Sequence, residues 1–447
     1  MSPASHVGVK QEGGDRGLAA IARAIRANRV DVAAVASGCL GRIEARDAEI
    51  HAFAHPDAEF LSRRAYLLDR YPEDKRGSMH GVPIAVADVL DVENLVCARG
   101  SEMYRGRRAP CDADVVARLR EAGAIPFGTT TSAEFGCFGP GRARSSVDAD
   151  RTAGGSGAAA AVASGAVVFA CEMRPDGMLS RPASYCGIYG LTVTRGVLST
   201  GGVCSLGTSL EGLGFYVREA EDVGFLARAL LGNRSVPKRR EAVAYRTEDL
   251  TVYALQSPSG YRVLPPMRSA INRALTILSD RKVAVTPRRL PAHFVKAEAC
   301  YDTMFSYEVS RCLTRDRDRA PDSLRPETLA RIDQGRRIDA SVFEAARRDA
   351  IALRSELLDL LVGDAVILDA AADGTAPPHE EDTGWSPWQA IWAIAGLPAV
   401  AIPCGAVAGL PVGVQVAAAP GREDLLARVA CLVEDGLLGV RPASASR

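Results

Sequence analysis

The chain has 447 residues, enough to bury a substantial core as one large domain or about two or three ordinary ones. Its 54 basic residues balance its 54 acidic residues, so nothing in its net charge favours binding to nucleic acid or to a membrane surface. Its apolar content of 47% is typical of a globular protein, and a small molecule or another protein remains as the partner.

The 11 cysteines are scattered between Cys39 and Cys431, and none forms a Cys-x-x-Cys pair. His51 and His55 are four residues apart, but no cysteine or third histidine lies close in sequence to complete a metal site. This pattern is typical of reduced thiols in a cytoplasmic protein, so we expect no disulfide, metal or cofactor. Residues 1–17 lack the apolar core of a signal peptide and are expected to be a disordered leader. No apolar run is long enough to cross a bilayer.

Apolar residues recur at three- and four-residue spacing between residues 18 and 46, as at Val32, Val35 and Cys39, and predict an amphipathic helix. A second helix is expected up to about residue 70. Two helices are therefore expected before the first strand.

That strand is predicted at residues 82–86, a short apolar run typical of a strand covered on both faces. A helix ending near Gly123 and a second strand at 124–128 follow. A helix between two strands at this spacing indicates a βαβ unit, so the sheet should be partly parallel. A helix at 158–165 and a strand at 166–171 repeat the pattern.

Charge clusters follow residue 231, and a peripheral helical region is expected near 235–350. Strands are predicted again in the segments DAVILDAA, LPAVAIP and VGVQVAAA, followed by a closing helix at 425–433. Because no internal repeat and no Pro- or Ser-rich linker is present, we expect a single domain over residues 18–447.

The stretch at 153–196 is rich in glycine and alanine, as required where backbones pack closely or approach a ligand. It resembles the signature segment of the amidase signature family, which carries a Gly-Gly-Ser-Ser-Gly-Gly loop, an Ala-rich helix and a Gly-rich segment with a nucleophilic serine. Further similar segments occur in the family's order: MHGVPIAVAD, GAIPFGTTTSAEFG, YCGIYGLTVTRG and AGLPAVAIPCG with LPVGVQV. The resemblance implies an α/β fold, a twisted mixed sheet covered by helices on both faces. It also implies amide chemistry by a serine, a second serine in a cis peptide and a lysine base.

The positions that match this machinery carry other residues. Ala87 matches the lysine, and Met178 matches the nucleophilic serine. Pro175 removes a backbone donor from the loop that should stabilise the oxyanion. An ungapped register places Gly154 at the cis serine, whereas a gapped register would match Ser156 to one of the two loop serines.

Two interpretations remain. The first is a pseudoenzyme that keeps the fold to bind a small molecule or a partner protein, with a homodimer left open. The second is an enzyme that acts on an amide or acyl substrate by another mechanism near the old site. The candidate residues at that site, for ligand or for chemistry, are Arg174, Asp176, Gly177, Met178, Ser180, Arg181 and Ser156, with Cys171 and Cys137 as further nucleophiles.

Each candidate has a plainer interpretation. Ser180 would more often be a satisfied loop hydroxyl, Cys171 a core residue, and the two arginines solvated or paired. His80, before the first predicted strand, is expected to be structural. The tryptophans 385, 388 and 392 would line a substrate funnel, as the resemblance implies, or pack in the core; the last two share a helical face.

Overall fold

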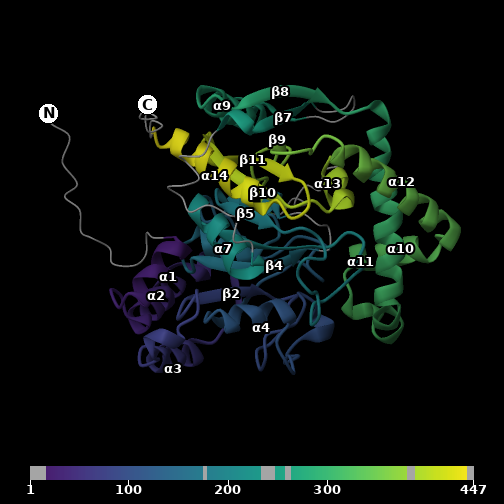
Figure 1. Cartoon of the computed structure of the whole chain (residues 1–447). Helices are drawn as coiled ribbons and strands as arrows, with labels where there is room; N and C mark the ends of the chain where they lie inside the picture. Colours follow the sequence, from purple (N-terminus) through teal and green to yellow (C-terminus); the bar gives the residue numbers. More distant parts are fainter. Residues whose placement is uncertain (1–16, 175–178, 233–246, 257–262, 380–387, 440–447) are drawn as a thin grey trace, which may run out of the picture.

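The computed structural model describes residues 17–174, 179–232, 247–256, 263–379 and 388–439. Eleven strands form one sheet in the order β1-β3-β2-β4-β6-β5-β10-β11-β9-β7-β8 (Figure 1). The strands are β1 (Phe53–Pro56), β2 (Pro83–Ala87), β3 (Ile125–Thr130), β4 (Phe169–Arg174), β5 (Tyr189–Thr192), β6 (Gly212–Val217), β7 (Thr251–Gln256), β8 (Ala284–Arg289), β9 (Ala365–Ala370), β10 (Ala399–Val407) and β11 (Leu410–Ala418). Strand β2 runs parallel to β3 and β4, and β7 runs parallel to β8 and β9. The other neighbouring pairs are antiparallel, so the sheet is mixed, as expected.

Helices flank this sheet, which confirms the predicted α/β class (Figure 1). Those of the first half are α1 (Leu18–Arg26), α2 (Val32–Ile50), α3 (Ala58–Leu68), α4 (Asp114–Glu121), α5 (Gly157–Ala163), α6 (Ser180–Cys186) and α7 (Ala220–Leu231). Those of the second half are α9 (Pro265–Asp280), α10 (Lys296–Arg319), α11 (Pro326–Arg336), α12 (Ala340–Leu358), α13 (Gln389–Ala395) and α14 (Glu423–Leu437). Helix α14 packs on α7, β10 and β11, and α6 packs on β5, β10 and β11. The long α10 contacts α11, α12 and α13 at the right of Figure 1.

The predicted βαβ unit is present as β2, α4 and β3, with Pro83 opposite Ile125 in a parallel register. Every residue of β2, β3 and β4 is buried, which explains why β2 is a continuous apolar run and why β3 and β4 begin as apolar runs before their polar ends. An apolar run predicts such a strand, because a strand buried on both faces shows no alternation of apolar and polar residues.

The N-terminal prediction was wrong in two respects. The single helix expected within residues 18–46 is two helices, α1 and α2, because Asn28 adopts a left-handed backbone (φ 50°) between them. Strand β1 also precedes β2 and pairs antiparallel with the outer side of β3. A strand of four residues at an edge is too short to produce a periodic signal.

The region near 235–350 was expected to be helical, yet it contributes two strands, β7 and β8, to the main sheet. Strand β8 is the outermost strand at the edge opposite β1, and most of its residues are exposed. Its sequence AVTPRR carries a proline and charges, which suit an unpaired sheet edge and hide the strand from an apolar-run search.

Residues 1–16 of the expected leader lie outside the described residues, and the division into a leader and one domain stays a prediction. Across the described part of the chain, no helix combines the length and apolar character needed to cross a membrane.

Candidate functional site

The sheet places Ala87 beside Glu172. Ala87 ends β2 and is fully buried, and Val86 before it lies opposite Cys171 of β4. Glu172 follows Cys171 along β4, so extending this parallel register by one residue sets Glu172 beside Ala87. On its other side, Ala87 pairs with Thr130 of β3. A methyl group thus lies between a carboxylate and a hydroxyl, and it can neither accept nor relay a proton.

Glu172 is the centre of a buried polar network. Its Oε2 accepts a hydrogen bond of 2.7 Å from Oγ of Ser156, and its Oε1 lies 3.9 Å from Nη1 of Arg174. The same Nη1 donates to the carbonyl oxygen of Gly154 at 3.5 Å. Side-chain exposure is only 1% for Glu172 and 2% for Arg174, so the two opposite charges compensate each other away from water.

Two further hydroxyls lie at this network. Burial, together with the charge of Glu172, raises the pKa of Tyr216 well above its usual range, so this phenol stays protonated. Within the described residues, Oγ1 of Thr130 is buried and has no hydrogen-bond partner. Thr130 pairs with Ala87, so this hydroxyl belongs to the strand beside the buried methyl group.

The glycine-rich loop before α5 brings Ser156 to Glu172. Gly154 and Gly155 adopt φ of 72° and 78°, which side chains rarely tolerate, and Ser156 then caps α5 by accepting from the backbone N–H of Ala159 at 3.0 Å. A Cβ added at Gly157 would lie 2.4 Å from the carbonyl oxygen of Ala52. These glycines therefore serve close backbone packing and set the position of Ser156.

Ser180 and Arg181 begin α6 and connect it to the C-terminal part of the sheet. Oγ of Ser180 donates to Oε1 of Gln415 on β11, and Nη1 of Arg181 donates to Oε1 of Gln389 on α13 at 3.3 Å. Both residues are buried. The plainer interpretation of Ser180 as a satisfied hydroxyl agrees with this bond, and both arginines of this segment are buried and not solvated.

The remaining residues of this segment, Asp176, Gly177 and Met178, lie outside the described residues, as does Pro175. The match of Met178 to the nucleophilic serine therefore stays a prediction. The other two positions are joined through one network, because Glu172 neighbours Ala87 while Arg174 reaches Gly154.

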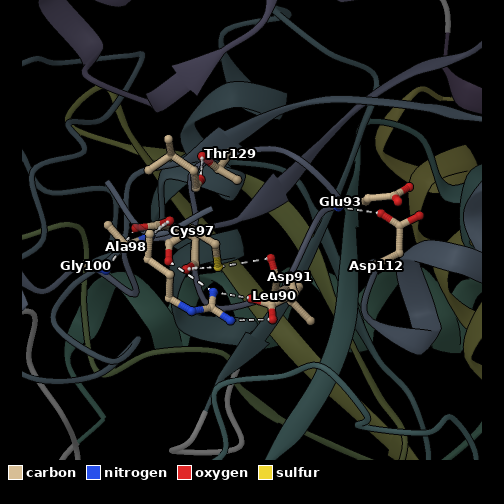
Figure 2. A network of polar contacts seen from close by, with 11 residues as sticks. Leu90, Asp91, Glu93, Cys97, Ala98, Gly100, Asp112 and Thr129 are labelled. Carbon is tan, nitrogen blue, oxygen red and sulfur yellow. Dashed lines mark hydrogen bonds and ion pairs between the residues drawn. The ribbon is translucent and has the colours of Figure 1, made fainter. Parts of the chain in front are cut away.

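The loop that follows β2 is held by its own polar contacts (Figure 2). The Asp88 carboxylate accepts from the backbone N–H groups of Ala98 at 2.7 Å and Gly100 at 2.9 Å, while burial raises its pKa to about 6. Arg107 forms two bonds of 2.7 Å to the Asp91 carboxylate, and this ion pair lowers the pKa of Asp91. The loop therefore fixes the end of β2 at the candidate site.

Asp369, at the end of β9, is a buried group that the sequence analysis missed. Its Oδ2 accepts from the indole N–H groups of Trp388 and, at 3.3 Å, Trp392. Burial raises the pKa of Asp369 to about 7. The two tryptophans share a face as expected, and they are buried; Trp385 lies outside the described residues. The available signal was the acidic residue inside the apolar run DAVILDAA.

The cysteine candidates differ in burial. Cys171 is fully buried, and burial raises the pKa of its thiol far above the usual range, so the thiolate that a nucleophile requires is not formed. Cys137 is partly exposed. Nε2 of His80 lies 3.0 Å from the carbonyl oxygen of Leu68, which fits a structural histidine.

Comparison with known proteins gives a consistent family match. The family model described as Amidase matches residues 34–427. The A subunit of glutamyl-tRNA(Gln) amidotransferase from Koribacter versatilis is 26% identical over 472 residues, covering 93% of this chain and 97% of that protein. The corresponding protein of Treponema pallidum is 44% identical, but over 153 residues, 32% of this chain and 30% of that protein. The chain thus spans less than a third of the length of this relative in that match.

Solved structures share the fold. One described as a vestigial protein complex that reveals the evolutionary origins of an s-triazine catabolic enzyme superposes with a TM-score of 0.84 at 25% identity, covering 94% of this chain and 98% of that chain. The structure of 6-aminohexanoate cyclic dimer hydrolase superposes with a TM-score of 0.81 at 22% identity, covering 96% of this chain and 98% of that chain.

Proposed function

The chain belongs to the amidase family, and we propose that it is a member that does not hydrolyse amides and acts by binding a small molecule or a partner protein. The observation that carries the proposal is the fully buried methyl of Ala87, where the family resemblance would place a lysine base. A serine hydroxyl is barely nucleophilic unless a neighbouring base takes its proton. With Met178 at the matching nucleophile position, neither half of that pair is present in the sequence.

The buried polar side chains that occupy this region support the same proposal. Ser156, Glu172 and Arg174 are each at most 2% exposed and are joined by hydrogen bonding and charge. A substrate carbonyl would have to displace this network before it could reach any of the three groups. Displacing it would leave buried charges without compensation, which costs several kcal/mol per ion.

A second candidate function rests on one contact. The hydroxyl of Ser156 donates to the Glu172 carboxylate at 2.7 Å, and a serine bonded to an acceptor is the arrangement of a nucleophile and its base. This would be an enzyme of altered mechanism acting on an amide or acyl substrate. Against it, Oγ of Ser156 also caps α5 and is buried, so attack requires the cap to open.

Partners and location are also part of the proposal. Relatives are named as subunits of an amidotransferase, and one similar structure is described as a protein complex. A role in an assembly, including a homodimer, is therefore proposed together with small-molecule binding. A cytoplasmic location is proposed from the scattered, unpaired pattern of cysteines in the sequence.

The test measures the release of ammonia or acid from a panel of primary amides, anilides and esters. The wild type is compared with Ser156→Ala, Ser180→Ala and Cys171→Ala. We expect no turnover in any of them. Turnover that Ser156→Ala abolishes would establish the altered mechanism, and turnover unchanged in all three variants would defeat both candidate functions as assigned.

A further inference from the structure

A pocket of about 360 Å³ lies at the opposite end of the strands from the candidate site. It is bounded by α3, by the turn before β2 and by the end of α4, and Ile125, the first residue of β3, lies in its wall. Ala87 and Thr130, at the candidate site, are the last residues of β2 and β3. A strand of this length separates the two places by roughly 15 Å, so this pocket is not part of the site described above.

Three cationic side chains line this pocket: Arg64, Lys75 and Arg120. The charge of Arg120 is compensated, because its Nε lies 2.6 Å from Oδ2 of Asp112. Arg64 and Lys75 are exposed and form no ion pair with any residue that the structure describes. Two cations that face a cavity and outnumber its acidic groups favour an anion there.

The other lining groups limit which anion fits. Glu121 also lines the pocket, so the uncompensated charges of Arg64 and Lys75 sum with it to one positive charge (+2 − 1). That balance matches a monoanion better than a phosphate, which carries about two negative charges at neutral pH.

Apolar and aromatic side chains share the lining of this pocket with the charged groups. Phe60, Leu68, Tyr71 and Ile125 line the pocket, and the Tyr71 ring stacks on His80 with ring centres 5.6 Å apart. Flat apolar walls with a few charged groups are typical of sites for small organic ligands. An aromatic ring would lie against these walls while its charged group meets the cations.

The pocket is formed before any ligand arrives. The N–H of Met79 donates to the carbonyl oxygen of Ala122 at 2.8 Å, and the N–H of Gly81 donates to that of Gly123 at 2.9 Å. A Cβ added at Gly77 would lie 2.3 Å from the oxygen of Ala122, so the two segments pack backbone to backbone. The backbone of this pocket is therefore preformed, which lowers the ordering entropy lost on binding.

From these observations we propose that this pocket is a binding site for a small aromatic carboxylate. The carboxylate lies between Arg64 and Lys75, and the ring lies against Phe60 and Tyr71. The proposal is independent of whether the chain hydrolyses amides, because no residue of the network around Glu172 takes part.

Isothermal titration calorimetry of the full chain with benzoate tests the proposal. Arg64→Gln and Lys75→Gln should each weaken binding about 3- to 10-fold, since each removes one charge-assisted contact at an exposed position. Glu121→Gln should tighten binding about 3-fold by removing a repulsive charge. Arg63→Gln is the matched control, because Arg63 lies on the same helix, is exposed and does not line the pocket.

Two comparison ligands distinguish the contribution of the negative charge to the affinity from that of the aromatic ring. Benzamide has the ring without the charge, and acetate has the charge without the ring; both should bind at least about 10-fold more weakly than benzoate. The proposal is overturned by the absence of saturable benzoate binding up to about 10 mM, or by benzamide binding as tightly as benzoate. Equal affinities for wild type, Arg64→Gln and Lys75→Gln would also overturn it, as would inorganic phosphate competing with benzoate at equal concentration.

Discussion

Replacing Ala87 by lysine returns a base to the position that the family resemblance assigns to it. The side chain enters a fully buried place beside Glu172 of the neighbouring strand. A lysine next to a carboxylate has a raised pKa and stays protonated at neutral pH, so it cannot act as a general base. We therefore expect Ala87→Lys to remain without amidase activity, even when combined with Met178→Ser.

The magnitude follows from the strand register. Two unit charges about 4 Å apart attract by about 4 kcal/mol at an effective dielectric constant near 20. Desolvation of the ammonium group and the presence of Arg174, 3.9 Å from the same carboxylate, reduce this value. We expect a net coupling of about 1–3 kcal/mol between the introduced lysine and Glu172, set against a packing cost of about 1–3 kcal/mol for the larger side chain.

A double-mutant cycle measured by urea unfolding isolates the coupling. Ala87→Lys and the uncharged, similarly sized Ala87→Met are each made in the wild type and in Glu172→Gln. The lysine variant should be more stable than the methionine variant only when Glu172 is present. A coupling below about 0.5 kcal/mol would refute the reasoning, because positions 87 and 172 would then not be neighbours.

Three further predictions concern stability. Burial raises the pKa of Asp369 to about 7, so the folded state holds this proton more tightly than the unfolded chain, and the group adds stability as pH falls from about 7 towards 4. Asp369→Asn should remove that gain, which is at most about 4 kcal/mol. The measurement is the free energy of unfolding at about pH 7 and about pH 4, and an unchanged pH dependence in the variant would contradict the prediction. Gly154→Ser should lower the free energy of unfolding by about 1–3 kcal/mol more than Gly363→Ser. Both glycines have φ near 70°, but only a Cβ at position 154 would lie 2.9 Å from Pro182. Equal costs in a thermal melt would argue against this close contact. Arg107→Ala and Asp91→Ala should show a coupling of about 1–3 kcal/mol in urea unfolding, because their paired bonds are partly shielded from water; additive effects would exclude it.

The buried strands were predictable, whereas the edge strands were not. Strand β2 is an apolar run because both its faces are covered, and β9 to β11 were recognised for the same reason. Strand β8 is exposed and charged, and β1 has four residues, so neither produces a pattern that distinguishes it from a loop. The resemblance to a family supplied the order of elements but not these edges.

The sequence predicted which positions belong to the site, but not which side chains contact one another there. The register of motifs placed Ala87 and Gly154 in the sequence, but the partner of Ser156 depends on how the loop at Gly154 meets β4. The bond from Trp388 to Asp369 likewise joins the start of α13 to β9, and these two residues are 19 positions apart in the sequence. Such pairings require the three-dimensional register, because residues of a single element carry no record of which distant strand lies beside them.

The central claim is that this member of the amidase family has no activated serine. Intact-mass spectrometry after incubation with a serine-directed fluorophosphonate tests it most directly, with a competent serine amidase of the family treated in parallel. We predict that the protein keeps its unmodified mass while the parallel enzyme is labelled. A stoichiometric adduct that peptide mapping places on Ser156 or Ser180 would contradict the account.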